Sequence, residues 1–234
     1  MEKQFKHARR RKKNAMATQN QLIEERYIPA LRYRLLTPLY DPVLKFVMRE
    51  ETFKHRLVER VQLLPGQHVL DLGCGTGTLT VMLKRSAPAA HITGMDGDEK
   101  VLAIARAKAR QAGVEILWDH GLATSLPYPD NSFDVVVSSL VVHHLVHADK
   151  PRAFQEVQRV LRPGGRFHLL DFGKPFNWIT RTQAALMRHL EETADNFDDL
   201  LPSMLEQAAF EKVLADEHAN NFFGPIWFYE AKKA

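Results

Sequence analysis

Short apolar runs alternate with amphipathic segments from about residue 65 onward. Runs rich in β-branched residues predict strands, and apolar residues spaced three and four apart predict helices. Five strands are predicted: His68–Leu72, His91–Asp96, Glu115–Trp118, Phe133–Ser139 and Arg166–Phe172. The helices predicted between them are Thr78–Arg85, Glu99–Ala112 and Pro151–Leu161. Strands that alternate with helices predict a parallel, doubly wound sheet.

The pattern changes after the fifth strand. It is helical from Asn177 to Ala208, with predicted breaks at Asp195–Asp199 and at Pro202. Two β-like runs at the end of the chain are joined by a short link, and they span residues 211–218 and 225–232. We therefore expect an α/β fold with a mostly parallel seven-stranded sheet, a C-terminal antiparallel hairpin and a helical insertion at about residues 176–209.

The first 64 residues lack this alternation. Residues 1–20 are polar and basic, and they are predicted to form a disordered tail. Residues 21–64 have a helical pattern that Pro38 and Pro42 interrupt, and they are predicted to form a helical cap. The domain that contains the sheet is then predicted to span residues 65–234.

Positive charge is concentrated at the N-terminus. Residues 1–13 hold seven basic residues and one acidic residue, so they carry +6, and the remainder, with 25 basic and 27 acidic residues, carries −2. A slightly acidic body argues against a nucleic-acid enzyme, so no DNA partner is expected. The basic segment at residues 3–13 predicts a solvated arm or a weak contact with an anionic membrane or RNA.

Two features bear on the compartment. Cys74 is the single cysteine, so the chain forms no internal disulfide, which favours a reducing, cytoplasmic setting. No run of about 18 apolar residues predicts a membrane-spanning helix. The N-terminus lacks the apolar stretch of a secretory signal. We therefore expect a cytoplasmic protein.

The stretch HVLDLGCGTGTLTVML joins a strand, a glycine turn and a helix, and in doubly wound folds such a turn binds a ligand. Its glycines, Gly73, Gly75 and Gly77, lack the G-x-G-x-x-G spacing of dinucleotide enzymes, and no P-loop lysine follows them. Asp71 ends the strand, where its carboxylate would repel phosphates and attract a cation.

Asp96 ends the second strand, where acids accept hydrogen bonds from ribose hydroxyls. A ligand with a ribose and a cationic group fits S-adenosylmethionine, which joins adenosine to a sulfonium and an amino acid. S-adenosylmethionine is therefore the expected cofactor.

Several segments carry a family resemblance in order: VLDLGCGTGTLT, GMDGD, LPYPDNSFDVVVSSLVVHHL, LRPGGRFHLLDF and LLPSMLEQAAF. From about Leu36 to the C-terminus, the chain resembles class I S-adenosylmethionine-dependent methyltransferases of the type 11 group, which are related to the ubiquinone and menaquinone C-methyltransferases. The resemblance implies a Rossmann-like domain that transfers a methyl group.

The resemblance also implies roles for individual residues. In this family the glycine turn lines the methionine part, Asp96 holds the ribose and Ser139 lies near the sulfonium. Ala123 would donate its N–H to adenine, but Leu122 cannot accept from the adenine amine, a departure that removes a hydrogen bond worth about 1 kcal/mol. The implied cofactor-binding residues are Tyr40, Asp71, Gly73, Cys74, Gly75, Thr76, Gly77, Asp96, Gly97, Leu122, Ala123, Ser139 and Leu140.

The candidate catalytic residues follow the fourth and fifth strands. Methyl transfer from a sulfonium is a direct displacement, so a general base is needed only when the acceptor arrives protonated. His143 and His144 follow the fourth strand, and His143 is the favoured base, with structural packing as the alternative. Asp171 ends the fifth strand, where it would hold the acceptor or cap the following turn. No metal site is predicted.

The helical insertion carries an apolar stripe of Trp178, Ile179, Ala185, Leu186 and Leu190. Core packing is the favoured interpretation of this stripe. If the stripe instead lines the acceptor pocket, the acceptor is apolar or lipid-like. Tyr40 has the same two interpretations, core packing or contact with the cofactor or the acceptor.

One motif is absent from the expected place. Enzymes that methylate base amino groups often carry Asp/Asn-Pro-Pro-aromatic after the fourth strand, where this chain has SSLVVHH. We therefore expect methyl transfer to a small-molecule or lipid-like acceptor of the quinol, phenol or amine type. Two alternatives remain open: a non-catalytic module that acts through protein or RNA contacts, and an RNA or protein methyltransferase.

Overall fold

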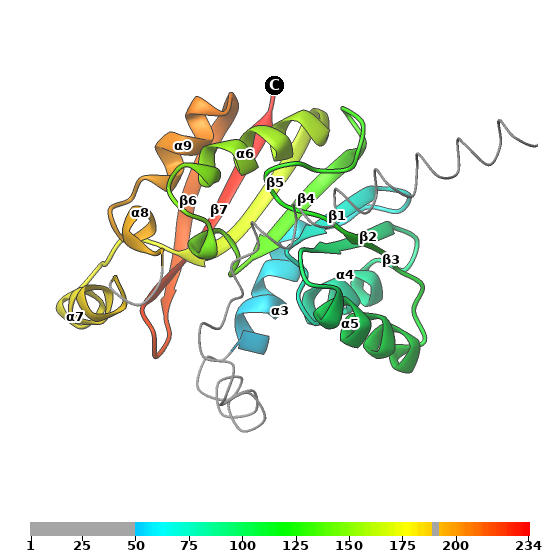
Figure 1. Ribbon diagram of the computed structural model, residues 1–234, viewed down its shortest axis with the longest axis horizontal. Coiled ribbons are helices and arrows are strands. Elements are labelled where there is room, and N and C mark those ends of the chain that lie inside the picture. The colour runs from blue at the N-terminus through cyan, green and yellow to red at the C-terminus, as the bar shows by residue number, and fades with distance from the viewer. Residues whose placement is uncertain (1–49, 189–191) are drawn as a thin grey trace, which may run out of the picture. The chain divides into compact units, whose positions relative to one another are not determined.

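The computed structural model describes residues 50–188 and 192–234, which all lie within one compact unit (Figure 1). Its strands are β1 (His68–Leu72), β2 (His91–Asp96), β3 (Leu117–His120), β4 (Phe133–Ser139), β5 (Leu161–Phe172), β6 (Phe210–Asn220) and β7 (Pro225–Lys233). Its α-helices are α3 (Glu50–Val61), α4 (Thr78–Ser86), α5 (Glu99–Ala112), α6 (Asp149–Val160), α7 (Trp178–Met187), α8 (Ala194–Phe197) and α9 (Leu201–Gln207). A 3₁₀ helix, η1, spans Val142–His144.

The described strands form a seven-stranded sheet in the order β3-β2-β1-β4-β5-β7-β6. Strands β1 to β5 are parallel, and β7 runs antiparallel to both β5 and β6. The predicted fold class, with its C-terminal antiparallel hairpin, is therefore confirmed. The order of the strands reverses between β1 and β4, and in such sheets ligands bind at the carboxyl ends of the strands beside this point.

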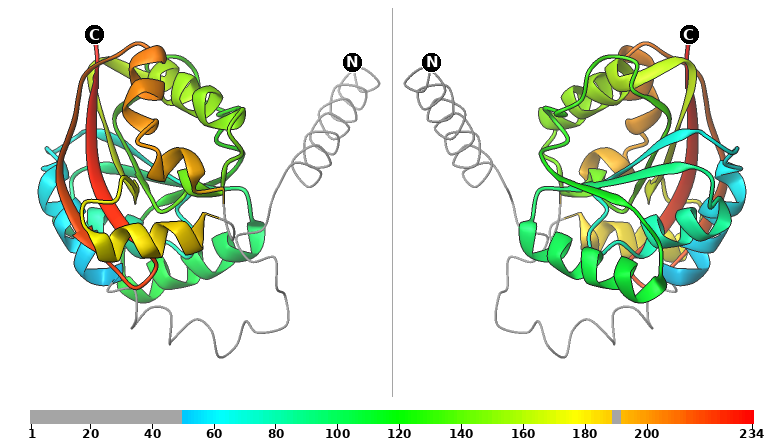
Figure 2. Two further views of the ribbon diagram at one scale, coloured as in Figure 1. Left: turned by 90° about the vertical axis from the view of Figure 1, so that its left-hand side faces the viewer. Right: turned by 90° about the vertical axis from the view of Figure 1, so that its right-hand side faces the viewer.

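Helices cover both faces of the sheet (Figure 2). Helices α3, α4 and α5 follow one another on one face, where α4 contacts both of the others and β2. Helices α6 and α9 contact each other on the opposite face and pack on β5 and β6 respectively. The apolar core is accordingly divided into two layers, one on each side of the sheet.

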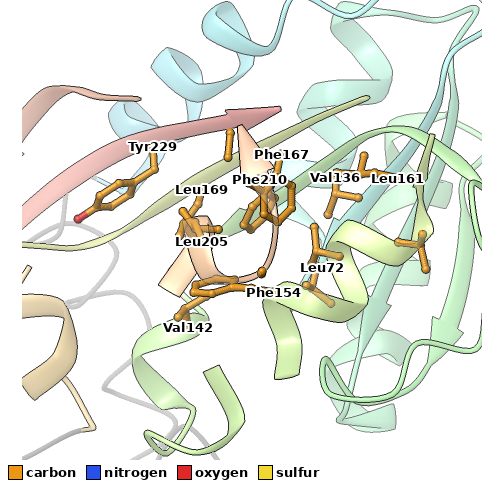
Figure 3. Close-up of a cluster of buried hydrophobic side chains, with 14 of the residues drawn as sticks. Leu72, Val136, Val142, Phe154, Leu161, Phe167, Leu169, Leu205, Phe210 and Tyr229 are labelled. Carbon is orange, nitrogen blue, oxygen red and sulfur yellow. The ribbon is translucent and has the colours of Figure 1, made fainter. Parts of the chain in front are cut away.

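The layer under α6 and α9 holds many of the aromatic side chains of the core. Figure 3 shows Phe154 of α6 beside Phe167 of β5, Phe210 of β6 and Leu205 of α9. The sequence predicts that Phe154, Val157, Val160 and Leu161 point inward, and all four are at most 1% exposed. This face of α6 is therefore confirmed.

The opposite layer includes α3. Phe53, Leu57 and Val61 are buried and pack with residues of β1, β4 and β5. The last helix of the predicted cap at residues 21–64 is thus part of the core of the sheet domain. Residues 21–49 of that predicted cap, and the predicted tail at residues 1–20, lie outside the described residues.

The third strand lies two residues later than predicted, at Leu117–His120 instead of Glu115–Trp118. Its pairing with β2 sets Thr93 against Leu117. Trp118 lies over Gly94, where an added β carbon would be 2.6 Å from the indole ring. The prediction placed the strand on the apolar residues of this run. The close fit between Trp118 and Gly94 instead determines the register of the strand.

The buried face of α5 also differs from the prediction. The apolar spacing predicts one face of Val101, Ile104, Ala105 and Ala112. Leu102, Ala105 and Ala109 are the buried residues instead, and Ile104 is 52% exposed. A β carbon on Gly77 would lie 2.8 Å from the Ala105 side chain, so α5 packs closely against the glycine turn. The close approach favours small side chains on the inward face of α5. The spacing of apolar residues does not indicate this, because it does not depend on side-chain size.

Three predicted boundaries also move. Strand β5 begins at Leu161 and continues past the Pro-Gly-Gly segment with an irregularity, instead of beginning at Arg166. Helix α6 begins at Asp149, two residues before the predicted start. Pro202 lies in the first turn of α9, where a proline is tolerated, so it does not break a helix.

The described helices are short or polar compared with a membrane span. None of them, within residues 50–188 and 192–234, combines the length and the apolar character that crossing a bilayer requires.

Candidate functional site

The glycine turn after β1 is held against β2 by its backbone. The N–H groups of Gly73 and Cys74 both donate to the carbonyl oxygen of Met95, at 2.8 and 3.0 Å. Gly73 has a φ of 70°, in the left-handed region that favours glycine. A β carbon at Gly73 would also lie 2.4 Å from a methyl group of Val141, in the segment after β4. The turn therefore needs glycine here for both conformation and space.

A cavity of about 170 Å³ lies beside this turn at the carboxyl ends of β1 and β4. Its lining residues are Lys54, Asp71, Gly73, Cys74, Gly75, Thr76, Leu79, Ser139 and Leu140. Seven of these nine residues were predicted from the sequence to contact the cofactor. The other two, Lys54 and Leu79, come from α3 and α4 and were not predicted.

Asp71 is buried at the bottom of this cavity. Thr80 donates its hydroxyl to Asp71 Oδ2 at 2.6 Å. Burial raises the pKa of Asp71 to about 6, although the Thr80 hydrogen bond and the charge of Lys54 lower it. The carboxylate is thus costly to ionise in the isolated protein, and a cation placed beside it would favour its ionised form.

Lys54 brings a positive charge to the same cavity. It is on α3, next to the core residue Phe53, and is only 9% exposed. In the sequence, Lys54 is one of several charged residues in a helical segment, so its position alone did not predict a role in the site. Its place in the site depends on the packing of α3 against the sheet, which the helical pattern did not indicate.

Asp96 lies next to the cavity, at the end of β2. Its Oδ2 accepts from the N–H of Gly75 at 2.8 Å, and its Oδ1 accepts from the N–H of Asp98 at 2.9 Å. Burial raises its pKa, and these backbone hydrogen bonds partly offset the rise. The side chain is therefore fixed beside the glycine turn, where a ribose was predicted. The carbonyl of Gly97 lies 3.0 Å from His120 Nε2.

The predicted adenine residues lie farther along the same edge. Leu122 forms an isolated bridge with Ser125, and Ala123 packs against the core layer under α6. Neither residue lines the 170 Å³ cavity. Tyr40, the remaining predicted cofactor residue, lies outside the described residues.

Ser139 and Leu140 form the far wall of the cavity. The hydroxyl of Ser139 is buried and finds no hydrogen-bond partner among the residues that the structure describes. Leu140 has a φ of 59°, a left-handed conformation that is rare for leucine. A buried, unpaired hydroxyl and a strained residue in the wall of a polar cavity are consistent with a site that is completed by a ligand.

Two of the candidate catalytic residues, His143 and Asp171, are in contact. His143 Nδ1 lies 2.8 Å from Asp171 Oδ1. Asp171 Oδ2 accepts from the N–H groups of Val141 and Val142, at 3.1 and 2.8 Å. One carboxylate therefore fixes both the His143 ring and the backbone that leads to it.

Asp171 is itself held by further residues. Its Oδ1 also accepts from the N–H of Phe172 and from Asn196 Nδ2, at 2.7 and 3.3 Å. Burial raises the pKa of Asp171, but the charge and hydrogen bond of His143 outweigh it, so the net pKa lies below its usual value. A carboxylate in this state only accepts hydrogen bonds, so the proton between the two residues belongs to His143 Nδ1.

A buried lysine extends this network. Lys150 of α6 is fully buried, and its ammonium donates to Asn196 Oδ1, Asp195 Oδ2 and the carbonyl of Glu192, at 3.1, 2.9 and 2.7 Å. Asn196 connects this ammonium to Asp171. The sequence analysis assigned no role to Lys150 or Asn196, since neither belongs to a local motif.

A second lysine contacts the glycine turn from outside the cavity. Lys108 of α5 donates to the hydroxyl groups of Thr76 and Thr78, at 3.0 and 2.6 Å. A larger hollow of about 700 Å³ lies on this outer side, between α3, α4 and α5. No described residue that was predicted for the site lines this hollow, so the smaller cavity is the better candidate.

The apolar stripe of the insertion is not core, contrary to the favoured interpretation. Trp178, Ile179 and Leu186 are 75%, 44% and 68% exposed, and Ala185 is exposed as well. Thr180 and Ala184 on the opposite side of α7 are the buried residues. Leu190 lies outside the described residues.

Comparison with known proteins gives a consistent result. A family model described as a methyltransferase domain matches residues 69–165. An uncharacterized methyltransferase from Synechocystis sp. is 36% identical over 167 residues, which cover 70% of this chain and 76% of that relative.

A second relative shares less of its length. A demethylmenaquinone methyltransferase from Thermus thermophilus is 36% identical over 142 residues, which cover 60% of this chain and 64% of that protein. The crystal structure of a putative methyltransferase from Bacillus halodurans matches with a TM-score of 0.62 at 20% identity, over 78% of this chain and 99% of that chain. The structural match supports the fold.

Proposed function

Because the chain belongs to the S-adenosylmethionine-dependent methyltransferases, we propose that it methylates a small-molecule or lipid-like acceptor of the quinol, phenol or amine type. The observation that carries this proposal is the buried His143–Asp171 pair, which is tied by the Val141 N–H to the segment that follows the cavity residues Ser139 and Leu140. Relatives include demethylmenaquinone methyltransferases, but the matches span only 64% and 53% of two of them.

The cavity residues fit the cofactor. Asp71 would accept hydrogen bonds from its amino group, Lys54 would face its carboxylate, and Asp96 would hold the ribose hydroxyls. When bound, S-adenosylmethionine supplies a methyl group on a positively charged sulfur. The unpaired hydroxyl of Ser139 and the acidic bottom of the cavity are suited to a ligand with this charge.

His143 is proposed to take a proton from the acceptor. The Nδ1–H of His143 donates to Asp171, so Nε2 is the nitrogen that can act as the base. Asp171 has no exposed surface and directs its oxygens to His143 and to backbone N–H groups. We therefore propose that Asp171 positions His143, in place of direct contact with the acceptor, which was one of its two predicted roles. His144 contacts His143, with ring centroids 4.0 Å apart.

The surroundings of His143 favour an apolar or aromatic acceptor. Phe172 lies edge-on to the His143 ring at 4.9 Å, and Phe197 lies 5.9 Å from Phe172. These buried aromatic side chains make the surroundings of His143 apolar, which suits an aromatic acceptor better than a charged polymer. This supports a quinol or phenol over a nucleic-acid base.

The test begins with calorimetric titration of the purified protein with S-adenosylmethionine and S-adenosylhomocysteine. Binding of both should be followed by formation of S-adenosylhomocysteine in a screen of quinols, phenols and lipid amines. Turnover confined to RNA or protein substrates would contradict the proposed acceptor class. Binding of neither compound would favour the alternative of a non-catalytic module.

A further inference from the structure

The described part of the chain presents an exposed apolar surface at one end of the sheet. We define the α7 surface as Trp178, Ile179 and Leu186 of α7 together with Phe222 of the loop between β6 and β7. Trp178 is 75% exposed, Leu186 and Phe222 are both 68% exposed, and Ile179 is 44% exposed. Apolar side chains gathered in this way on a surface mark an interaction site more often than scattered ones do.

The two parts of this surface are joined by hydrogen bonds. Gln183 Nε2 of α7 donates to the carbonyl oxygens of Asn221 and Phe222, at 3.0 and 3.1 Å. These hydrogen bonds hold the loop between β6 and β7 against α7. Phe222 of this loop therefore extends the apolar face of the helix.

The surface is presented on a fixed element. Asn177 accepts from the N–H of Thr180 at 2.8 Å in a capping box at the start of α7. Thr180 and Ala184 are buried on the side of α7 that faces the protein. Helical spacing then places Trp178, Thr182 and Leu186 on the outward side. The exposed face is thus a consequence of how α7 is anchored.

Helix α7 carries positive charge and no negative charge, although acidic residues lie nearby. From Phe172 to Leu190 the sequence contains no Asp or Glu, but it contains Lys174, Arg181 and Arg188. Lys174 and Arg188 pair with Asp199 and Asp198, whereas α7 itself carries Arg181 and no acidic residue. An amphipathic helix with a tryptophan, apolar residues and flanking arginine suits the boundary between water and an anionic lipid layer.

The location of the surface agrees with this partner. Helix α7 follows β5, and the hairpin loop precedes β7, which runs antiparallel to β5. Both therefore lie at the carboxyl end of β5, the end that carries Asp171 (Figure 1). A lipid layer in contact with α7 would face the same edge of the sheet as the proposed acceptor site.

We propose that the α7 surface docks on the surface of an anionic phospholipid bilayer, with Trp178, Ile179, Leu186 and Phe222 at the level of the lipid head groups. The inference goes beyond methyl transfer and does not depend on which acceptor is used. Docking of this kind needs no spanning helix.

The test is co-sedimentation of the full chain with vesicles of phosphatidylcholine, with and without phosphatidylglycerol. Binding should be stronger to the anionic vesicles. Leu186→Ser should weaken it by at least about fivefold, because an apolar side chain no longer enters the lipid layer. Leu117→Ser is the matched control, since Leu117 is 69% exposed at the other edge of the sheet and its change should leave binding within about twofold.

A second measurement locates the contact directly. Vesicles with brominated acyl chains should quench the emission of Trp178 on binding. Trp178→Phe should remove this quenching and retain binding, because phenylalanine preserves the apolar contact. Quenching of the same size in Trp178→Phe would place the contact at another tryptophan and would overturn the proposal.

Three other results would also overturn the proposal. One is that the chain does not bind anionic vesicles. Another is equal binding of the wild type and Leu186→Ser, which would assign the contact to another part of the chain, such as the basic residues 3–13. The third is a concentration-dependent dimer that Leu186→Ser abolishes, without vesicle binding, which would assign the surface to a second copy of the chain.

Discussion

The proposed cofactor half of the site comes mainly from one continuous stretch, Asp71–Gly77, whereas the proposed acceptor half is assembled from separate segments. In the cofactor half, this stretch supplies most of the cavity lining, which Lys54, Leu79, Ser139 and Leu140 complete, and Asp96 accepts a hydrogen bond from Gly75 beside it. In the acceptor half, His143 depends on Asp171, which depends on Asn196 and through it on Lys150. Local sequence therefore determines the first half, and tertiary packing determines the second.

The largest expected effect concerns the base of the acceptor half. His143→Ala should lower turnover by about a hundredfold or more if proton removal from the acceptor limits the reaction. The affinity for S-adenosylmethionine should stay within about twofold, because His143 lies outside the cofactor cavity. Steady-state kinetics and calorimetry measure the two quantities. His91→Ala, at the amino end of β2, is the control, and a full-rate His143→Ala would leave His143 with a structural role only.

The next effect tests whether distant side chains support the acceptor half. Lys150→Met should lower the free energy of unfolding by about 3 kcal/mol, because it leaves Asp195 and buried Asn196 without their ammonium partner. Turnover should fall as well, whereas binding of S-adenosylmethionine should persist in the folded fraction. Urea unfolding gives the stability, with exposed Lys100→Met as the control. Unchanged stability would contradict the role given to this network.

A smaller effect is expected in the cofactor half. Asp71→Asn should weaken S-adenosylmethionine binding at pH 7.5 by about 2 kcal/mol, because a charged hydrogen-bond acceptor is lost. Since the pKa of Asp71 is raised to about 6, wild-type affinity should fall as the pH drops below 6, where the carboxyl becomes neutral. The variant should not show this step. Calorimetry between pH 5 and 8 would reveal a persistent step if another group were responsible.

The smallest effect separates a structural histidine from the proposed catalytic one. Burial lowers the pKa of His168 to about 3, and its Nε2 has no partner among the described residues. The unfolded chain, with a histidine pKa near 6.5, then binds a proton that the folded chain does not, so stability falls as the pH drops below 6.5. At pH 5.5 this costs about 1.4 kcal/mol.

His168→Leu should remove that loss and leave turnover intact. The measurement is the difference in unfolding free energy between wild type and variant at pH 5.5 and at pH 7.5. A difference that does not change with pH would show that His168 titrates normally in the folded protein.

The same contrast explains how much could be predicted from the sequence. The order of elements and the mostly parallel sheet follow from the alternation of apolar and amphipathic segments. The wall of the cofactor cavity follows from the turn of Gly73, Gly75 and Gly77, because a glycine turn between a strand and a helix indicates a ligand site. The register of β3 does not follow from local patterns, because it depends on the fit of Trp118 over Gly94.

The acceptor half was predictable only as a list of candidates. His143 and Asp171 were identified by their positions after two strands, and the structure brings them together. Asn196 and Lys150 could not be identified, since their roles depend on hydrogen bonds between residues that are 25 and 46 positions apart in the sequence. The exposure of α7 was also missed, because an apolar stripe alone does not show whether a protein core or another partner covers it.

Gly73 and Val141 are in contact at the border between the two halves. A β carbon on Gly73 would have no space beside the Val141 side chain. In evolutionary terms, these two positions cannot change independently. A descendant that acquires a new acceptor by remodelling the segment after β4 must keep a residue at position 141 that leaves room for the cofactor turn. The border therefore restricts which acceptor specificities this chain can reach by single substitutions, even though the cofactor takes no part in choosing the acceptor.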